Sequence, residues 1–342
     1  MNKCIYLKES DEIQTFNKAE HIFPAGIGGV RKLPKGYVSD NVNGIIFSKM
    51  ELDFMRNSVI SICREIEGPG KRGSLSLKKA TKSKVGISKD EEGQVKLAYI
   101  KKAKPYSIDQ IKISEFKVVG LTIGKSEYKP DYENLKEFVI KLERFVDGYK
   151  NHHITYIKDV SIDLETILIG EFDSDWYLAS NKNEIDLYNV IEGIRKSISY
   201  LKNQKSLEKV ISKVEFKFKK EFNMTNFFRV CVKMAFNYLA YRTNRDYVCS
   251  REFDKLREYV LGEIDEFEVN ILENGALINK YELPKRCHTI TISTCDENLF
   301  AIVSFYDEAF NVGMILSNKA DNLINPFIGV CDWKNNNEYD LI

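Results

Sequence analysis

The chain has 342 residues, of which 43% are hydrophobic and 12% aromatic, so it carries enough apolar material for a packed core and is not an intrinsically disordered protein. Lysine and arginine together number 51 against 50 acidic residues, and the resulting net charge of +1 argues neither for nor against a nucleic-acid partner. The seven cysteines show no paired spacing, which predicts free thiols in a reducing cytosol.

The first dozen residues carry charge and lack an apolar core of signal-peptide length. Nowhere does the sequence contain an unbroken apolar run long enough to span a bilayer. We therefore expect a soluble, cytoplasmic protein without a membrane partner.

The first distinctive stretch begins at Glu20 and reads Glu-His-Ile-Phe-Pro-Ala-Gly-Ile-Gly-Gly, with Asn43 following in the next segment. An acidic residue before a histidine, then a β-branched residue, a proline and a Gly-Gly turn form a specific order. This order resembles the core of HNH endonucleases, and the resemblance covers residues 1–75. It implies a ββα-metal hairpin in which Asn43, at the start of the following helix, closes the site.

Phosphodiester hydrolysis with one metal ion explains these residue types. Imidazole has an unperturbed pKa near working pH, so His21 is the candidate general base that activates water. The resemblance implies Mg²⁺ or Mn²⁺ held by the oxygen ligands of Glu20 and Asn43. Adjacent residues of a strand point to opposite faces, so Glu20 and His21 share one groove only if the backbone bends between them.

The sequence departs from the family at its structural zinc. Many relatives bind this zinc with two cysteine pairs, but the corresponding positions here are Cys4, Leu7, Ser39 and Val42. A closed tetrahedral site needs all four ligands, so we expect no structural zinc and apolar packing of Leu7 and Val42. The middle asparagine of the family also lacks a counterpart, and Asp40 and Asn41 are the candidate substitutes.

Within residues 1–75 we expect strands near residues 4–7, 16–23 and 37–38. A helix should begin around Asn43, because apolar residues recur at a spacing of four and make a stripe that can pack on the hairpin. This helix should end before Gly68-Pro69-Gly70.

A dense positive run follows the nuclease-like module, without any acidic residue inside it. It either contacts phosphates beside the catalytic groove or forms a solvated linker. The candidate phosphate contacts are Lys71, Arg72, Lys78, Lys79, Lys82 and Lys84.

The central region, residues 76–185, has alternating strand patterns between residues 94 and 125 and again at 167–172. A helix is expected from residue 131 to residue 148, with Gly148 as its cap. The pair His152-His153 has no acidic or cysteine partner at ligand spacing, so we do not assign a metal to it.

The last region, residues 186–342, should begin with helices near residues 191–201, 227–241 and 250–262, with a strand at 214–218. An antiparallel meander is expected at 288–293, 299–305 and 310–316, in which His288 has a structural role. Several basic residues lie near one side of the helical pair, either as a phosphate-facing surface or as an ordinary amphipathic pattern: Arg229, Lys233, Arg242, Arg245 and Arg251.

The sequence therefore predicts an α+β protein with an N-terminal ββα-metal module, a mixed central region, and a C-terminal region for substrate recognition or oligomerisation. The implied function is a metal-dependent endonuclease acting on DNA, with RNA as an alternative substrate. By analogy, such modules act in bacterial antiphage defence or restriction, as homodimers or with a partner protein. Two alternatives stay open: a nucleic-acid-binding or sensor protein with a decayed module, and a purely structural partner in a larger complex.

Overall fold

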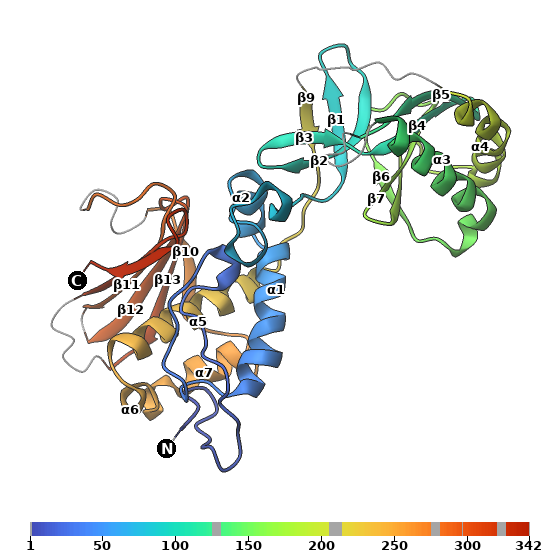
Figure 1. Ribbon diagram of the computed structural model, residues 1–342. Helices are drawn as coiled ribbons and strands as arrows, with labels where there is room; N and C mark the ends of the chain where they lie inside the picture. The colour runs from blue at the N-terminus through green and yellow to red at the C-terminus, as the bar shows by residue number, and fades with distance from the viewer. Residues whose placement is uncertain are drawn as a thin grey trace. The chain divides into compact units, whose positions relative to one another are not determined.

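The computed structural model describes residues 2–124, 131–204, 214–274, 281–295, 297–319 and 326–341. Contacts within the chain divide it into two units (Figure 1). Unit 1 combines Met1–Thr81 with Lys220–Ile342, and unit 2 is Lys82–Lys219. The sequence indicated three successive regions, whereas the residues of unit 1 come from both ends of the chain.

Unit 1 contains a six-stranded antiparallel sheet with the strand order β10-β13-β12-β11-β14-β15. The predicted meander is confirmed by its three central strands, while three short outer strands were not recognised in the sequence. The strands are β10 (Val269–Leu272), β11 (His288–Cys295), β12 (Asn298–Phe305), β13 (Phe310–Ser317), β14 (Phe327–Asp332) and β15 (Asn337–Asp340).

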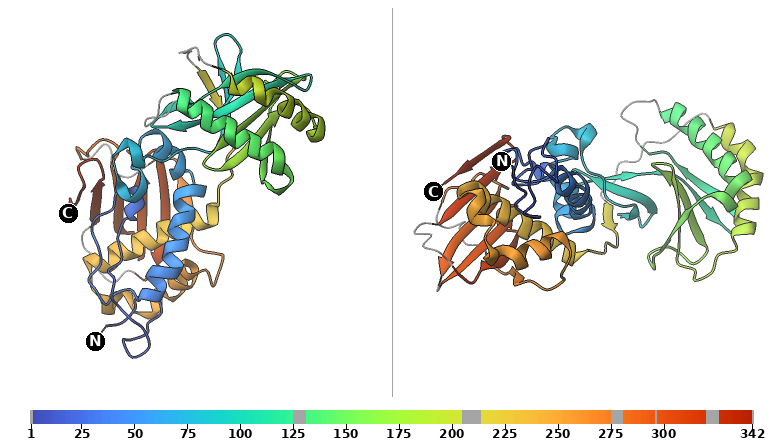
Figure 2. Two further views of the ribbon diagram at one scale, coloured as in Figure 1. Left: turned by 45° about the vertical axis from the view of Figure 1, so that its right-hand side comes forward. Right: turned by 90° about the horizontal axis from the view of Figure 1, so that it is seen from below.

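One face of this sheet is covered by α5 (Met224–Arg242), which contacts β11, β12 and β13. Figures 1 and 2 show α5 between the sheet and α1 (Ser48–Asn57). Because α5 has neighbours on both sides, its residues from Val230 to Ala240 are all buried. Two shorter helices, α6 (Arg245–Val248) and α7 (Asp254–Leu261), pack on it. The helices predicted at 227–241 and 250–262 are thus confirmed.

The N-terminal segment of unit 1 has less regular structure than its sequence indicated. The strands expected at 4–7 and 37–38 do not form, and that expected at 16–23 is reduced to one bridge at His21. A π-helical turn, Val42–Phe47, runs into α1. The single expected helix is interrupted at Ser58, whose extended backbone and hydroxyl bond to the Phe54 carbonyl oxygen (2.6 Å) end α1. Then α2 (Ile60–Ile66) ends before Gly68, as predicted.

The described residues of unit 2 form two sheets and two α-helices. A four-stranded antiparallel sheet has the order β3-β2-β1-β9, and a five-stranded mixed sheet has the order β5-β4-β7-β8-β6, with β6 parallel to β8. Its strands are β1 (Gly86–Asp90), β2 (Val95–Lys101), β3 (Lys104–Ser107), β4 (Asp109–Ser114), β5 (Lys117–Thr122), β6 (Ile154–Lys158), β7 (Thr166–Phe172), β8 (Asp175–Ser180) and β9 (Val214–Lys217).

Both helices of unit 2 pack on the same face of the five-stranded sheet, α3 (Asp131–Gly148) and α4 (Leu187–Lys202). Unit 2 has one hydrophobic cluster on each face of this sheet, because side chains alternate along β7. Ile167 and Ile169 face the helices, while Leu168 packs with Leu97 of the other sheet. The predicted helix at 131–148 and strand at 167–172 are confirmed.

No helix in the described part of the chain is both long and apolar enough to cross a membrane. The cysteines whose side chains are described are free thiols: Cys4, Cys63, Cys231, Cys249, Cys287 and Cys331.

Candidate functional site

The HNH-like segment forms a short antiparallel hairpin. The Ile22 amide donates to the Arg31 carbonyl oxygen at 3.0 Å, and the Leu33 amide donates to the Glu20 carbonyl oxygen at 2.8 Å. His21 and Lys32 lie opposite each other between these bonds. This is the non-hydrogen-bonded type of pair, in which facing side chains lie closest.

The Gly-Gly turn of the hairpin is required by space and by backbone conformation. Gly28 has a φ of +95°, and a Cβ there would lie 2.3 Å from the Cβ of Trp333. A Cβ at Gly29 would lie 1.8 Å from the Phe23 carbonyl oxygen. The turn therefore depends on these two glycines, since a side chain at position 28 would collide with Trp333 and one at position 29 with the main chain of Phe23.

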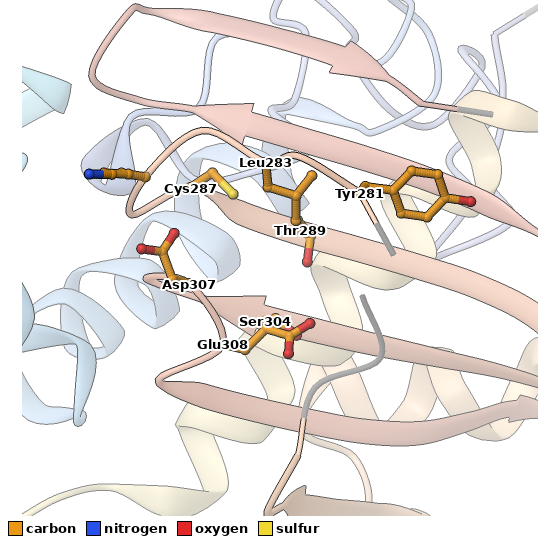
Figure 3. A pocket seen from close by; sticks show the side chains of 8 residues that line it. Tyr281, Leu283, Cys287, Thr289, Ser304, Asp307 and Glu308 are labelled. Carbon is orange, nitrogen blue, oxygen red and sulfur yellow. The ribbon is translucent and has the colours of Figure 1, made fainter. Parts of the chain in front are cut away.

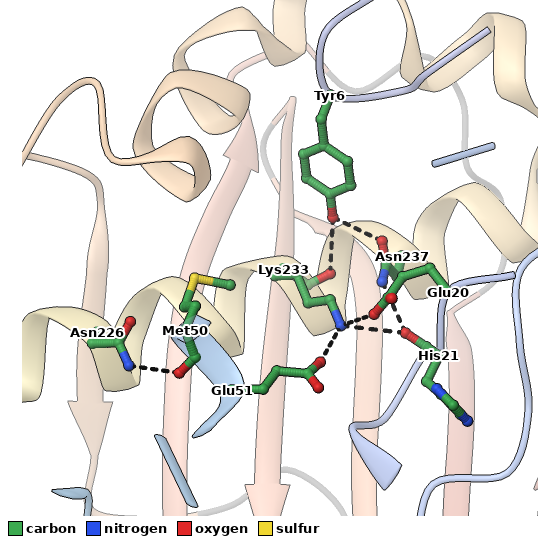
Figure 4. A network of polar contacts seen from close by, with 8 residues as sticks. All are labelled: Tyr6, Glu20, His21, Met50, Glu51, Asn226, Lys233 and Asn237. Carbon is green, nitrogen blue, oxygen red and sulfur yellow. Dashed lines mark hydrogen bonds and ion pairs between the residues drawn. The ribbon is translucent and has the colours of Figure 1, made fainter. Parts of the chain in front are cut away.

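Glu20 and His21 point in opposite directions, as expected for neighbours in an extended segment. Figure 4 shows the Glu20 carboxylate directed at the ammonium group of Lys233 and the His21 ring directed away from it. Glu20 is 5% exposed and Lys233 is fully buried. The ion pair corrects the expectation that Glu20 is free to bind a metal, because its carboxylate faces the core and holds a lysine.

Lys233 is the centre of a buried polar network on α5. Its ammonium donates to Glu20, to Glu51 Oε1 at 2.6 Å and to the His21 carbonyl oxygen at 3.4 Å. One helical turn later, Asn237 Nδ2 donates to the same His21 carbonyl oxygen at 3.0 Å. The main chain of His21 is therefore fixed by two side chains of α5.

Burial lowers the pKa of Lys233, but the carboxylates of Glu20 and Glu51 outweigh burial, and the net pKa is raised above its usual value. Tyr6 completes the network, because its hydroxyl donates to Asn237 Oδ1 at 2.7 Å. Burial raises the pKa of Tyr6 well above 10, so the hydroxyl stays protonated. Burial raises the pKa of Glu20 while Lys233 opposes this effect, so the network centres on a lysine cation paired with the side chains of Glu20 and Glu51.

A second group of contacts fixes the other strand of the hairpin. The Arg31 amide donates to Glu338 Oε1 at 3.0 Å, and the Val30 amide donates to the same oxygen. The Arg31 guanidinium pairs with Asp340 at 2.7 Å. Burial raises the pKa of Glu338 to about 7, against the opposing effect of the two amides and Arg31. The hairpin is therefore held on one strand by α5 and on the other by β15.

The His21 ring is half-buried and neutral at pH 7. Burial, then the positive charges of Lys32 and Lys233, lower the pKa of His21 from 6.5 to about 4. A neutral imidazole has a nitrogen able to accept a proton. The ring is therefore unprotonated across the physiological range and can accept a proton, as a weaker base than an ordinary histidine.

Asn43 lies in the π-helical turn that precedes α1 and is half-buried. Its main-chain amide donates to the Ser39 carbonyl oxygen at 3.0 Å. Within the described residues, no hydrogen bond joins its side chain to Glu20 or His21. The three predicted catalytic residues thus divide: Glu20 belongs to the core network, while His21 and Asn43 keep polar side chains outside it.

Of the two candidate substitutes for the middle asparagine, Asp40 already has partners in the loop before it. The Asp40 carboxylate accepts bonds from the Asn17 and Lys18 amides, and these bonds lower the pKa of Asp40 to about 2. Asn41 is exposed and makes no side-chain capping bond. Asp40 is an anchor for the loop at residues 15–18.

Three of the four positions compared with zinc ligands in the sequence, Cys4, Ser39 and Val42, lie together in the structure. The Ser39 amide donates to Cys4 Sγ at 3.5 Å, and the Val42 amide donates to Ser39 Oγ at 3.5 Å. Val42 is fully buried and Leu7 packs on the same core, as predicted from their apolar character. Among the described residues, no group of three or more His, Cys, Asp or Glu side chains could hold a metal ion.

The basic run begins beside the hairpin turn, since residues 71–73 pack on residues 25–27. Arg64, which is buried, ties this region together by donating to the carbonyl oxygens of Gly26, Met55 and Gly70 at 3.0–3.2 Å. The predicted phosphate contacts in unit 1 are all exposed: Lys71, Arg72, Lys78 and Lys79. Lys82 and Lys84 are exposed too but belong to unit 2, where Lys82 pairs with Asp173 at 3.0 Å.

Three of the five basic residues predicted on the C-terminal helices have partners or are buried within unit 1. Lys233 lies in the core, Arg229 pairs with Asp265 at 2.8 Å, and Arg242 bonds to the Tyr238 hydroxyl at 3.2 Å. The sequence did carry a signal for the network. A lysine and an asparagine stand four residues apart inside the apolar run of α5, a spacing that places both on one face of a helix.

Comparison of the sequence with models of protein families finds no match, and comparisons with curated proteins and with solved structures find none either.

Proposed function

We propose that the protein is an endonuclease of the HNH type that hydrolyses phosphodiester bonds of DNA, with His21 as the general base. The observation that carries this proposal is the hairpin itself. It holds the main chain of His21 on Lys233 and Asn237 while directing the ring away from the core, and the chain then enters the helix that contains Asn43. The grouping of Cys4, Ser39 and Val42 supports the same topology.

In this proposal the His21 ring removes a proton from water while the water oxygen forms a bond to phosphorus. The bond between phosphorus and one ester oxygen breaks, and that oxygen leaves with a proton from solvent. Lys32, across the hairpin from His21, places a positive charge beside the phosphate. Asn43 offers an amide to hydrogen-bond the phosphate oxygens.

The predicted ion, Mg²⁺ or Mn²⁺, does not fit the two residues proposed for it. Such an ion supplies charge neutralisation at the phosphate when bound. Asn43 has a suitable oxygen, but Glu20 is buried against Lys233. No catalytic step is therefore assigned to a metal at Glu20.

Exposed cations near the hairpin supply the contact with the nucleic acid backbone. Lys71 and Arg72 lie next to the turn that follows His21. Each phosphate that they neutralise releases counterions, so binding should weaken as salt increases. A role in antiphage defence would agree with this activity, by analogy alone.

The second candidate function is a nucleic-acid-binding or sensor protein without catalysis. The pairing of Glu20 with Lys233 favours it, because this pairing removes the carboxylate that the resemblance assigns to the metal. In this second function the basic residues bind the nucleic acid, and no phosphodiester bond is hydrolysed.

Incubation of the full chain with supercoiled plasmid, with and without Mg²⁺ or Mn²⁺, separates the two functions. We expect cleavage by the native protein and loss of at least a hundredfold in rate for His21→Ala, in line with the usual contribution of a general base. His153→Ala is the matched control, since His153 is an exposed histidine of unit 2. Salt-dependent DNA binding without cleavage by any variant would establish the sensor function and refute the nuclease.

A further inference from the structure

The six-stranded sheet of unit 1 has a polar row on the face turned away from α5. Ile290, Val303 and Val312 pack in the core with α5. Their neighbours Thr289, Ser304 and Asn311 therefore point to the other face, since side chains alternate along a strand. The pairing registers place these three side by side across β11, β12 and β13.

A cavity of about 220 Å³ lies against this row. Thr289 and Ser304 line it from the sheet, as Figure 3 shows, and Tyr281 and Leu283 line it with aromatic and aliphatic surface. Its volume is about seven times the share of one liquid water, ~30 Å³, and so accommodates roughly ten non-hydrogen atoms at organic packing density.

Two buried polar groups of the row have no partner within the described residues. Thr289 is 2% exposed and its hydroxyl makes no hydrogen bond. Asn311, also 2% exposed, donates through its amide nitrogen to the Glu308 carbonyl oxygen at 2.9 Å, but its amide oxygen accepts no bond. Buried polar groups are almost always satisfied, and each exception needs an explanation. A ligand in the adjoining cavity supplies one at Thr289.

The charged groups at the cavity disfavour an anionic ligand. Two carboxylates, those of Asp307 and Glu308, line it against the single ammonium group of Lys285, so an anion would meet more repulsion than attraction. Burial raises the pKa of Cys287 to about 12, and its thiol therefore stays protonated and unreactive. The pocket fits reversible binding of a neutral polar molecule.

We propose that this pocket binds a nucleobase, either in a free nucleoside or in an unstacked base of a nucleic-acid strand. A nucleobase is planar, has about ten non-hydrogen atoms, and carries donors and acceptors on its edges. The hydroxyls of Thr289 and Ser304 can each donate and accept, and Tyr281 offers an aromatic ring of the kind on which bases stack. The proposal does not depend on cleavage at His21.

Titration of the full chain with adenosine, guanosine, cytidine and thymidine, followed by calorimetry or ligand-observed NMR, tests the pocket. We expect at least one nucleoside to bind, and Thr289→Val to weaken its binding at least tenfold, because valine keeps the shape and removes the hydroxyl. Thr291→Val is the matched control: Thr291 lies two residues along the same strand, on the same face, and does not line the cavity.

Thermal unfolding of both variants shows whether each is folded, and Ser304→Ala gives a second measurement from the neighbouring strand. Absence of binding by all four nucleosides, or equal binding by Thr289→Val and Thr291→Val, would overturn the proposal. A short single-stranded oligonucleotide that competes with the nucleoside assigns the pocket to nucleic acid. Binding of the nucleoside without such competition assigns it to the free nucleoside. His21→Ala should bind as the native protein does, which separates this result from any loss of nuclease activity.

Discussion

Unit 1 contains two buried polar regions that differ in how completely their groups are partnered. Around Lys233, each charge and amide described above meets a partner from another segment. In the row on the far side of the sheet, the Thr289 hydroxyl and the Asn311 amide oxygen have none among the described residues. A partnered network can fix the position of one segment on another, whereas an unpartnered row keeps hydrogen-bonding capacity for something outside the chain.

The largest expected effect comes from removing the central cation. Lys233→Met would leave the Glu20 carboxylate buried without its partner, and we expect the free energy of unfolding to fall by about 3–5 kcal/mol. Chemical denaturation measures the change. Lys49→Met, at an exposed lysine of α1, should have little effect.

A double variant checks the reason for that loss. Adding Glu20→Gln to Lys233→Met removes the orphaned charge, so the double variant should recover part of the stability. If Lys233→Met costs less than about 1 kcal/mol, the network does not hold the hairpin on α5, and the comparison between the two regions fails.

Tyr6→Phe is the next strongest test. The variant keeps the ring packed on Phe47 but leaves Asn237 Oδ1 without its 2.7 Å bond inside the core. We expect a loss of about 1–3 kcal/mol, the usual range for an orphaned buried acceptor. Tyr188→Phe, at an exposed tyrosine of unit 2, is the control for removing a hydroxyl. Equal unfolding free energies for the two variants would contradict a structural role for the Tyr6 hydroxyl.

The pH dependence of stability provides a smaller effect with a definite sign. The pKa of His21 is about 4 in the folded chain and lies near 6.5 when the residue is unperturbed. The unfolded chain therefore binds more protons between these values, and stability from this residue is complete above pH 6.5 and lost as the pH falls towards 4. His21→Gln should flatten this part of the profile. An NMR titration that places the His21 pKa near 6.5 would contradict the burial of the ring.

The elements of the fold followed from the sequence where the apolar pattern was long and regular. The helices around residues 131–148 and 227–241 and the three central strands of the meander are all present. The short N-terminal strands were wrong, since that segment is held by side chains such as Lys233 and Glu338 and not by a ladder of main-chain bonds. Such contacts join residues more than two hundred positions apart, which no local pattern reports.

For the candidate site, the sequence correctly indicated that Glu20 and His21 would point to opposite faces, because that follows from strand geometry alone. It did not identify the partner of Glu20. Lys233 was grouped with arginines of the same helices by its charge, whereas its position between Val232 and Met234 in an apolar run was the stronger signal. Where a lysine at such a position is buried, it needs a partner, because lysine is almost never fully buried unless it is paired.

The smallest expected effect is on the stability of Thr289→Val, which should not fall as it does in the variants above. Thr289→Val removes a hydroxyl that gains no hydrogen bond on folding, and the added methyl group enters a buried site, so we expect stability to stay constant or to rise by up to about 1 kcal/mol. Tyr6→Phe also removes one buried hydroxyl, but one that has a hydrogen-bond partner, whereas Thr289→Val removes a hydroxyl without a partner among the described residues and adds a methyl group. Unfolding by denaturant, without added nucleoside, compares them directly. A loss above about 1 kcal/mol for Thr289→Val would mean that the hydroxyl is already satisfied in the folded chain, and the row would then be a structural network like the one around Lys233.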